Sequence, residues 1–223
     1  IMIKDIISST LLIATEGIIQ IKLNDRLMTT WNGDTKGSLG NKIASLLFGN
    51  TSTTYGSWVN FYWDDVALND ATGDINNSWC GNGSILCLSP IANGSIINCT
   101  PMEGTQNFEN VDDVTPDADT SYNASYNIGD VDLFKFKLPD EISGETVVNA
   151  ITIATQGKYV EQPLNIGHIV SVDGEQVETA NIRLSNGYIP LSSMIQINPK
   201  TGDKFTVNEI NNNVEVGYKT KDY

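Results

Sequence analysis

The chain has 223 residues and a net charge of −14, with 27 acidic residues against 13 lysines and arginines. Nucleic acids and anionic membrane surfaces attract basic patches, so this charge argues against both as partners. Charged residues make up only 18% of the chain, below the roughly 25% that is usual in globular proteins. The length suits two domains of about 100 residues, each large enough to bury a core.

The beginning of the chain predicts short strands at residues 10–15, 17–22 and 26–31. The apolar segment 6–21 is broken by Glu16 and is too short to cross a bilayer, so no transmembrane helix is expected. A signal peptide over residues 2–14 is disfavoured because Asp5 occupies the region that such a peptide fills with basic residues. We therefore predict that this segment forms a strand.

Residues 55–63 form an aromatic segment whose side chains alternate as they do in a strand. Alternation directs about half of them inward, so a core strand is the simpler prediction. The alternative is a platform on which Trp58 and its aromatic neighbours stack against sugars. Further short strands are expected at residues 85–88 and 95–99.

The middle of the chain has no lysine or arginine between Lys42 and Lys135, but it holds twelve carboxylates. The same stretch contains all six Asn-x-Ser/Thr triplets, the acceptor pattern for N-linked glycosylation. Their number is a mild excess over chance, whereas their confinement to residues 50–125 predicts an outward-facing, glycosylated surface. The candidate acceptors are Asn50, Asn76, Asn82, Asn93, Asn98 and Asn123.

Residues 102–130 contain few apolar side chains, which predicts a loop or linker. We place the domain boundary at its end, with one β-sandwich domain over residues 1–127 and a second over residues 128–223. Several aspartates of this segment could surround a calcium ion, since hard cations prefer oxygen ligands. The ligand order of a known calcium loop is absent, so a solvated acidic segment is the simpler prediction. These aspartates are Asp112, Asp113, Asp117 and Asp119.

The three cysteines, Cys80, Cys87 and Cys99, match no zinc or haem spacing. An odd count leaves at least one thiol free or paired between chains. Two interpretations stay open: small buried side chains, or a disulfide between Cys80 and Cys87. With a single histidine in the chain, we expect no metal site and no cofactor.

The C-terminal half predicts about eight strands between residues 128 and 223, at the spacing of a β-sandwich. Asp173-Gly174 and Asn186-Gly187 separate pairs of apolar runs, and both dipeptides favour the positive φ of type I′ hairpins. We therefore predict two-residue turns with positive φ at both glycines. A further strand is expected over residues 204–210.

No constellation for catalysis stands out in the sequence. His168 would have to serve any Ser-His or Cys-His arrangement, but it lies inside an expected strand and no Gly-x-Ser-x-Gly elbow exists. The carboxylate pairs are adjacent in sequence, so their side chains face opposite ways on a strand. We predict that His168 is structural and that the protein is not an enzyme.

The whole profile resembles the turret, or vertex spike, proteins of turreted icosahedral archaeal viruses. The shared features are the length, two β-domains, acidic loops with sequons from Asn50-Thr51-Ser52 to Asn123-Ala124-Ser125, and a hairpin-rich second half ending in residues 211–216. The resemblance implies jelly-roll domains, display on the virion surface, and homo-pentamers that assemble with a penton base and a second turret protein. A host-surface glycan or protein would be the external partner.

The alternative from another class is a carbohydrate-binding module or adhesin that uses the aromatic segment around Trp58. The low charge density adds one expectation for either function. Lysines and arginines are scarce, so few carboxylates can be essential ion-pair partners, and the fold should persist in acid.

Overall fold

The computed structural model describes residues 7–11, 17–23, 26–33, 65–66, 74–77 and 83–223. It divides the chain into two compact units, Ile1–Leu86 and Cys87–Tyr223. Among the described residues, no helix is long and apolar enough to cross a membrane.

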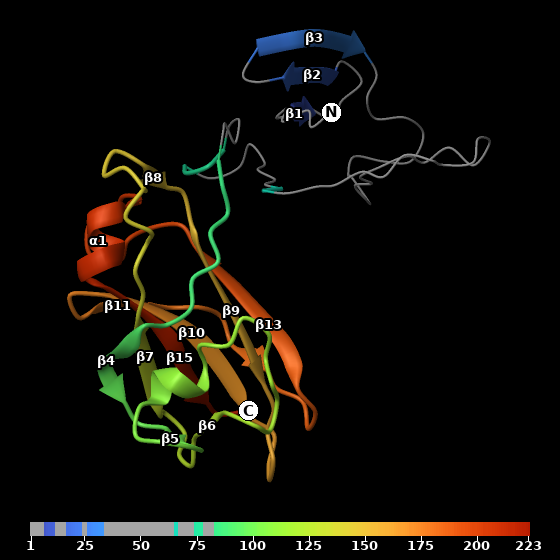
Figure 1. The fold of residues 1–223 in the computed structure, drawn as a ribbon. Coiled ribbons are helices and arrows are strands. Elements are labelled where there is room, and N and C mark those ends of the chain that lie inside the picture. Colours follow the sequence, from blue (N-terminus) through green and yellow to red (C-terminus); the bar gives the residue numbers. More distant parts are fainter. Residues whose placement is uncertain (1–6, 12–16, 24–25, 34–64, 67–73, 78–82) are drawn as a thin grey trace, which may run out of the picture. The chain divides into compact units, whose positions relative to one another are not determined.

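The described part of the first unit includes a three-stranded antiparallel sheet whose strands follow one another along the chain (Figure 1). The strands are β1 (Ile7–Leu11), β2 (Gly17–Leu23) and β3 (Arg26–Gly33). A β-bulge interrupts the β2–β3 register between Ile21 and Lys22. The three strands expected here are therefore present, although β1 begins and ends earlier than predicted. The aromatic segment 55–63 lies outside the described residues.

A six-stranded antiparallel sheet forms the larger layer of the second unit, in the order β11-β10-β15-β7-β4, with β12 also paired to β10. Its strands are β4 (Ala92–Ile97), β7 (Val131–Lys135), β10 (Asn165–Val172), β11 (Glu175–Glu178), β12 (Ile182–Arg183) and β15 (Val214–Lys221). Residues 85–88, predicted as a strand, lie before this sheet and form no strand.

A two-stranded ribbon, β9 (Ile151–Gly157) and β13 (Ile189–Ile195), packs on one face of the sheet, here called the inner face. Buried and exposed side chains alternate along β13, with Leu191 and Ile195 buried and Met194 exposed. This period-two pattern is that of a strand with one face on a core. The second unit is therefore built from two β-layers.

Shorter elements lie at the two ends of these layers (Figure 1). At one end, β8 (Val147–Val148) pairs with β14 (Phe205–Thr206), and α1 (Val207–Asn212) follows β14 directly. At the other end, β5 (Thr100–Pro101) pairs with β6 (Asn123–Ala124) beside the short 3-10 helix η1 (Asn107–Asn110).

The main hydrophobic core lies between the inner face, the ribbon and α1. Val170, Val216 and Phe205 are among its buried members, and a smaller cluster forms around Ile166 and Leu191. Ten buried residues make up the main cluster: Leu138, Ile153, Val170, Val172, Ile195, Phe205, Val207, Ile210, Val214 and Val216.

The two predicted hairpin turns have different outcomes. Asp173 and Gly174 have φ values of 49° and 89° and join Val172 to Glu175 in a two-residue hairpin, so this prediction is confirmed. The prediction for Asn186-Gly187 is wrong, because Gly187 does not have a positive φ. The flanking strands β12 and β13 pair with β10 and β9, in different layers, so the dipeptide belongs to a crossing between layers.

The predicted strand over residues 204–210 is also wrong beyond Thr206. Thr206 Oγ1 accepts a hydrogen bond from the backbone N–H of Glu209 at 3.2 Å, and the Glu209 carboxylate accepts from the Thr206 N–H at 2.8 Å. This reciprocal capping box starts α1 at Val207.

The structure places the boundary between compact units at residue 87, where the sequence suggested residue 128. Residues 92–124 belong to the second unit because β4 pairs with β7 and the buried Asp132 of β7 bonds to the backbone of Asn98 and Cys99. The all-β class is confirmed. Jelly-roll topology and a sandwich in the first unit stay predictions.

Candidate functional site

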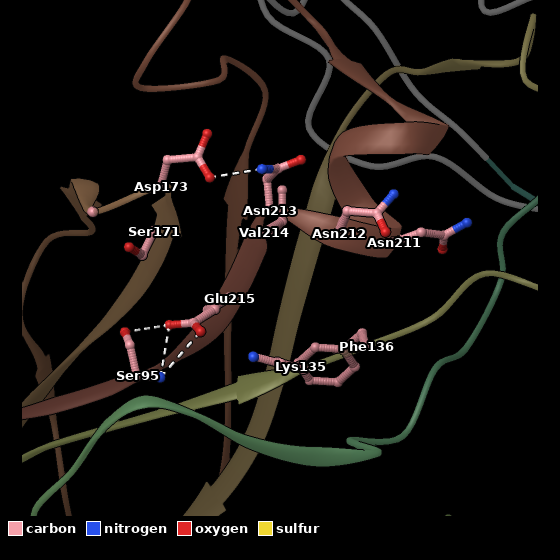
Figure 2. Close-up of a pocket in the computed structure, with 11 residues that line it drawn as sticks. Ser95, Lys135, Phe136, Ser171, Asp173, Asn211, Asn212, Asn213, Val214 and Glu215 are labelled. Atoms are coloured by element: carbon pink, nitrogen blue, oxygen red, sulfur yellow. Dashed lines mark hydrogen bonds between the residues drawn. The ribbon is translucent and has the colours of Figure 1, made fainter.

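A pocket of about 290 Å³ lies on the outer face of the sheet, between α1 and the β10–β11 turn (Figure 2). Three neighbouring strands supply its floor. Ser171 of β10 pairs with Glu215 of β15, and Glu215 pairs with Lys135 of β7, so the three residues form one cross-strand row. A hydroxyl, a carboxylate and an ammonium group therefore stand side by side.

Of the groups on the floor, the Glu215 carboxylate is occupied by internal hydrogen bonds and the Lys135 ammonium is available. The Glu215 carboxylate accepts hydrogen bonds from the Ser95 N–H at 3.0 Å and from the Ser95 hydroxyl at 2.5 Å. Within the described residues, the Lys135 ammonium and the Ser171 hydroxyl have no bonded partner. Ser171 is only 2% exposed. No hydrogen bond joins the Ser171 hydroxyl to the neighbouring Glu215 carboxylate, whose oxygens accept from Ser95 instead.

The rim of the pocket is held rigidly by its asparagines. Asn213 donates to Asp173 at 2.6 Å, and the other Asp173 oxygen pairs with Lys200 at 2.6 Å. These two partners hold the pKa of Asp173 below its ordinary value, with Lys200 the larger cause. Asn211 accepts from the Leu138 N–H at 2.7 Å. These internal bonds fix the side chains of Asp173, Asn211 and Asn213 around the pocket.

His168 is fully buried in the inner face, as expected of a structural histidine. Its Nε2 lies 2.9 Å from the Thr155 hydroxyl of β9, and its Nδ1 lies 2.8 Å from the Ser193 hydroxyl of β13. Burial lowers its pKa. A neutral imidazole between two hydroxyls therefore joins the two layers.

Asp132 is the centre of a second buried polar group on the same face. One carboxylate oxygen accepts from the N–H groups of Asn98 and Cys99, both at 2.9 Å. The other accepts from the Asn107 amide at 2.8 Å and the Tyr218 hydroxyl at 3.4 Å. Burial, followed by the nearby Asp132, raises the pKa of the Cys99 thiol to about 12. This network fastens the β4–β5 turn and η1 to the sheet.

The predicted glycosylation acceptors lie in different environments. Asn98 is exposed, while Asn76, Asn93 and Asn123 are half-buried. Asn50 and Asn82 lie outside the described residues, as does Cys80. Cys87 is exposed with a free thiol and Cys99 is buried with a free thiol. The free thiol of Cys87 does not support the predicted Cys80–Cys87 disulfide.

The acidic segment offers little for a metal ion. Asp119 pairs with Lys158 at 2.6 Å and accepts from the Tyr188 hydroxyl at 2.9 Å, and these partners lower its pKa. Lys158 also lies over the Tyr188 ring, 4.3 Å from its centroid. Among the described residues, no group of three or more His, Cys, Asp or Glu side chains could hold a metal.

Sequence reasoning missed both the pocket and the role of Asp132. The pocket depends on cross-strand register, which a single sequence does not reveal. A signal for Asp132 did exist, because it shares a strand face with the buried Phe134. Comparison of the chain with protein families, curated proteins and solved structures finds no match.

Proposed function

We propose that the chain is a non-enzymatic structural protein of a virion exterior, forming part of a vertex turret that serves in host attachment. The observation that carries this proposal is the all-β second unit, in which buried polar side chains fasten loops to the sheet. Asp132 fastens the β4–β5 turn and η1 in this way, and His168 joins the ribbon to the sheet through two hydroxyls. A displayed protein needs such a scaffold for its loops.

The proposal requires a homo-pentamer that docks on a penton base beside a second turret protein. Multi-angle light scattering of the purified full chain, followed by negative-stain electron microscopy, tests the first requirement. We expect a species of five times the monomer mass and class averages with five-fold symmetry. A strictly monomeric chain over the whole accessible concentration range would contradict the turret role.

Carbohydrate binding is a second candidate, and the outer-face pocket is the observation that favours it. Sugars present vicinal hydroxyls that both donate and accept, and the floor offers the exposed Lys135 ammonium as a donor to them. Phe136 also lines the pocket and supplies an apolar surface. The aromatic segment around Trp58, which first suggested this class, lies outside the described residues.

Saturation-transfer NMR with a panel of neutral monosaccharides tests this candidate. Lys135→Met should abolish the transfer, because it removes an unpaired ammonium group and keeps the hydrocarbon chain. Lys137→Met is the matched control, since Lys137 lies outside the pocket and pairs with Asp140 at 2.8 Å. No transfer to any sugar, or equal transfer in both variants, would overturn binding at this pocket.

A further inference from the structure

The sequon Asn98-Cys99-Thr100 has both of its recognised side chains on the surface. Asn98 and Thr100 are exposed, while Cys99 between them is 6% exposed and bonded to Asp132. The chain bends at Cys99, between β4 and β5. The N–H groups of Asn98 and Cys99 both donate to one Asp132 oxygen at this bend, which fixes the Cys99 side chain inward. The buried cysteine thus holds the asparagine and the threonine outward together.

The orientation of the Asn98 amide follows from one hydrogen bond. The backbone N–H of Val131 donates to the side chain of Asn98 at 3.1 Å, and only the amide oxygen can accept it. The amide nitrogen must then occupy the other position, in which it has no partner within the described residues. The Thr100 hydroxyl is equally without a partner among those residues. Both groups that glycosylation uses are available.

In the sequon at Asn123, by contrast, both the amide nitrogen and the hydroxyl of the third residue are engaged in hydrogen bonds. Its amide nitrogen donates to the backbone carbonyl of Asn107, a residue that is only 2% exposed, at 2.9 Å. Its amide oxygen is buried without a hydrogen-bond partner among the described residues. The hydroxyl of Ser125 donates to the Asp130 carboxylate at 2.9 Å. A sugar on this nitrogen would have to enter the packed region around η1.

The sequon at Asn93 is also used internally. The Asn93 amide nitrogen donates to Gln106 at 3.1 Å, and its oxygen accepts from the Phe108 N–H at 2.9 Å, which positions η1. The Ser95 hydroxyl donates to Glu215 on the pocket floor. Neither recognised group of this sequon is available in the folded protein.

We infer that Asn98 is an N-glycan acceptor of the folded protein, and that Asn93 and Asn123 are structural residues within sequons. The donor is a lipid-linked oligosaccharide phosphate or diphosphate. A bond forms between Nδ2 and the anomeric carbon of the sugar as the carbon–oxygen bond to the lipid phosphate breaks. The lipid phosphate leaves with that electron pair, and Nδ2 gives up one proton. Oδ1 keeps its bond to Val131. The inference does not depend on the turret role.

The experiment is site-specific mapping of the full chain, secreted from a eukaryotic host and purified as folded protein. Peptide N-glycosidase in ¹⁸O-labelled water converts each glycosylated asparagine to labelled aspartate, which peptide mass spectrometry locates. We expect label at Asn98 in most molecules and essentially none at Asn93 or Asn123. Folded protein with an unmodified Asn98, or with label at Asn123, would overturn the inference.

Two variants separate acceptor from structural roles. Asn98→Asp keeps an oxygen for the Val131 N–H, and Thr100→Ala keeps Asn98 itself; both should lose this glycan without a change in folding. Asn123→Asp should leave the Asn98 glycan in place and lower the melting temperature, because the bond to Asn107 is lost. Incubation of the folded, unglycosylated chain with a single-subunit oligosaccharyltransferase and a lipid-linked donor gives an independent measurement. Modification of Asn123 rather than Asn98 there would also refute the assignment.

Discussion

The inner face of the six-stranded sheet is apolar near α1 and polar further along the same strands. The apolar rows pair Val172 with Val214, and Val170 with Val216. One pleat further on, the polar row pairs His168 with Tyr218 and Tyr218 with Asp132. Both regions are buried, but the apolar rows are stabilised by packing and the polar row by saturated hydrogen bonds. The two should therefore respond differently to substitution and to pH.

Asp132→Ala should have the largest effect on stability. It removes the common acceptor of the Cys99 N–H, the Asn107 amide and the Tyr218 hydroxyl, and each buried donor left unpaired costs about 1–3 kcal/mol. We expect the free energy of unfolding, measured with urea, to fall by about 4 kcal/mol. Asp132→Asn keeps one oxygen and should cost less. A loss below about 1 kcal/mol for the alanine variant would show that the polar row is not stabilising.

Val170→Ala tests the apolar rows in the same way. The side chain is fully buried, so the truncation removes hydrocarbon contacts and leaves a cavity. We expect a loss of about 2 kcal/mol in urea denaturation, equal at pH 7.0 and pH 5.5 because no titrating group is involved. A loss that changed with pH would break the proposed distinction between the two regions.

Acidification should act through His168. Burial lowers its pKa in the folded protein, so the unfolded chain binds the proton more readily and stability falls as the pH drops below the unfolded value. Between pH 7.0 and 5.5 we expect the free energy of unfolding to fall, by at most about 1.3 kcal/mol, since the unfolded pKa is about 6.5. His168→Gln should remove this dependence on pH. If the free energy of unfolding of the variant fell with pH as much as that of the wild type, another group would be responsible for the pH dependence.

Glu178→Gln should have the smallest effect. Glu178 pairs with Lys219 and Lys221 on the outer face, each at 2.8 Å, and all three side chains are partly exposed to solvent. Solvent and salt screen such pairs, so we expect a loss of about 0.5 kcal/mol at low ionic strength and less in 1 M salt. Thermal melts at two salt concentrations measure it. A loss as large as that of Val170→Ala would place the outer face among the main sources of stability.

The fold is expected to persist down to about pH 4 because the carboxylates that form ion pairs with lysines stay ionised above that pH. The pKa values of Asp173 and Glu178 are lowered by their lysine partners, so their contribution is present above the unfolded pKa of about 4 and lost below it. Circular dichroism between pH 7 and 3 should show no cooperative unfolding above that point.

Local sequence signals predicted the local structure best. Asp173-Gly174 forms its hairpin because the two strands that it joins pair directly with each other. The same chemistry at Asn186-Gly187 failed because the choice of partner strands is a property of the whole fold. The sequence Thr206-Val207-Asn208-Glu209 has the spacing of a capping box, a local signal for the start of a helix at Val207.

The long polar segment shows why the boundary between units was misplaced. Residues 102–130 are poor in apolar side chains, which indicates a linker when burial is assumed to be hydrophobic. The structure instead buries Asn107 and Asn110 and bonds Asn107 to Asp132. Polar packing of this kind depends on partners distant in sequence, so composition does not reveal it.

The rate at which the Cys99 thiol is alkylated reports how often this end of the protein opens. A thiol with a pKa of about 12 carries almost no reactive thiolate at neutral pH, and its burial excludes an alkylating reagent. Labelling must then wait until the β4–β5 turn moves away from Asp132. The exposed Cys87 reacts without that delay and serves as the reference. The ratio of the two labelling rates, resolved by peptide mapping, measures how often the native protein opens at this end.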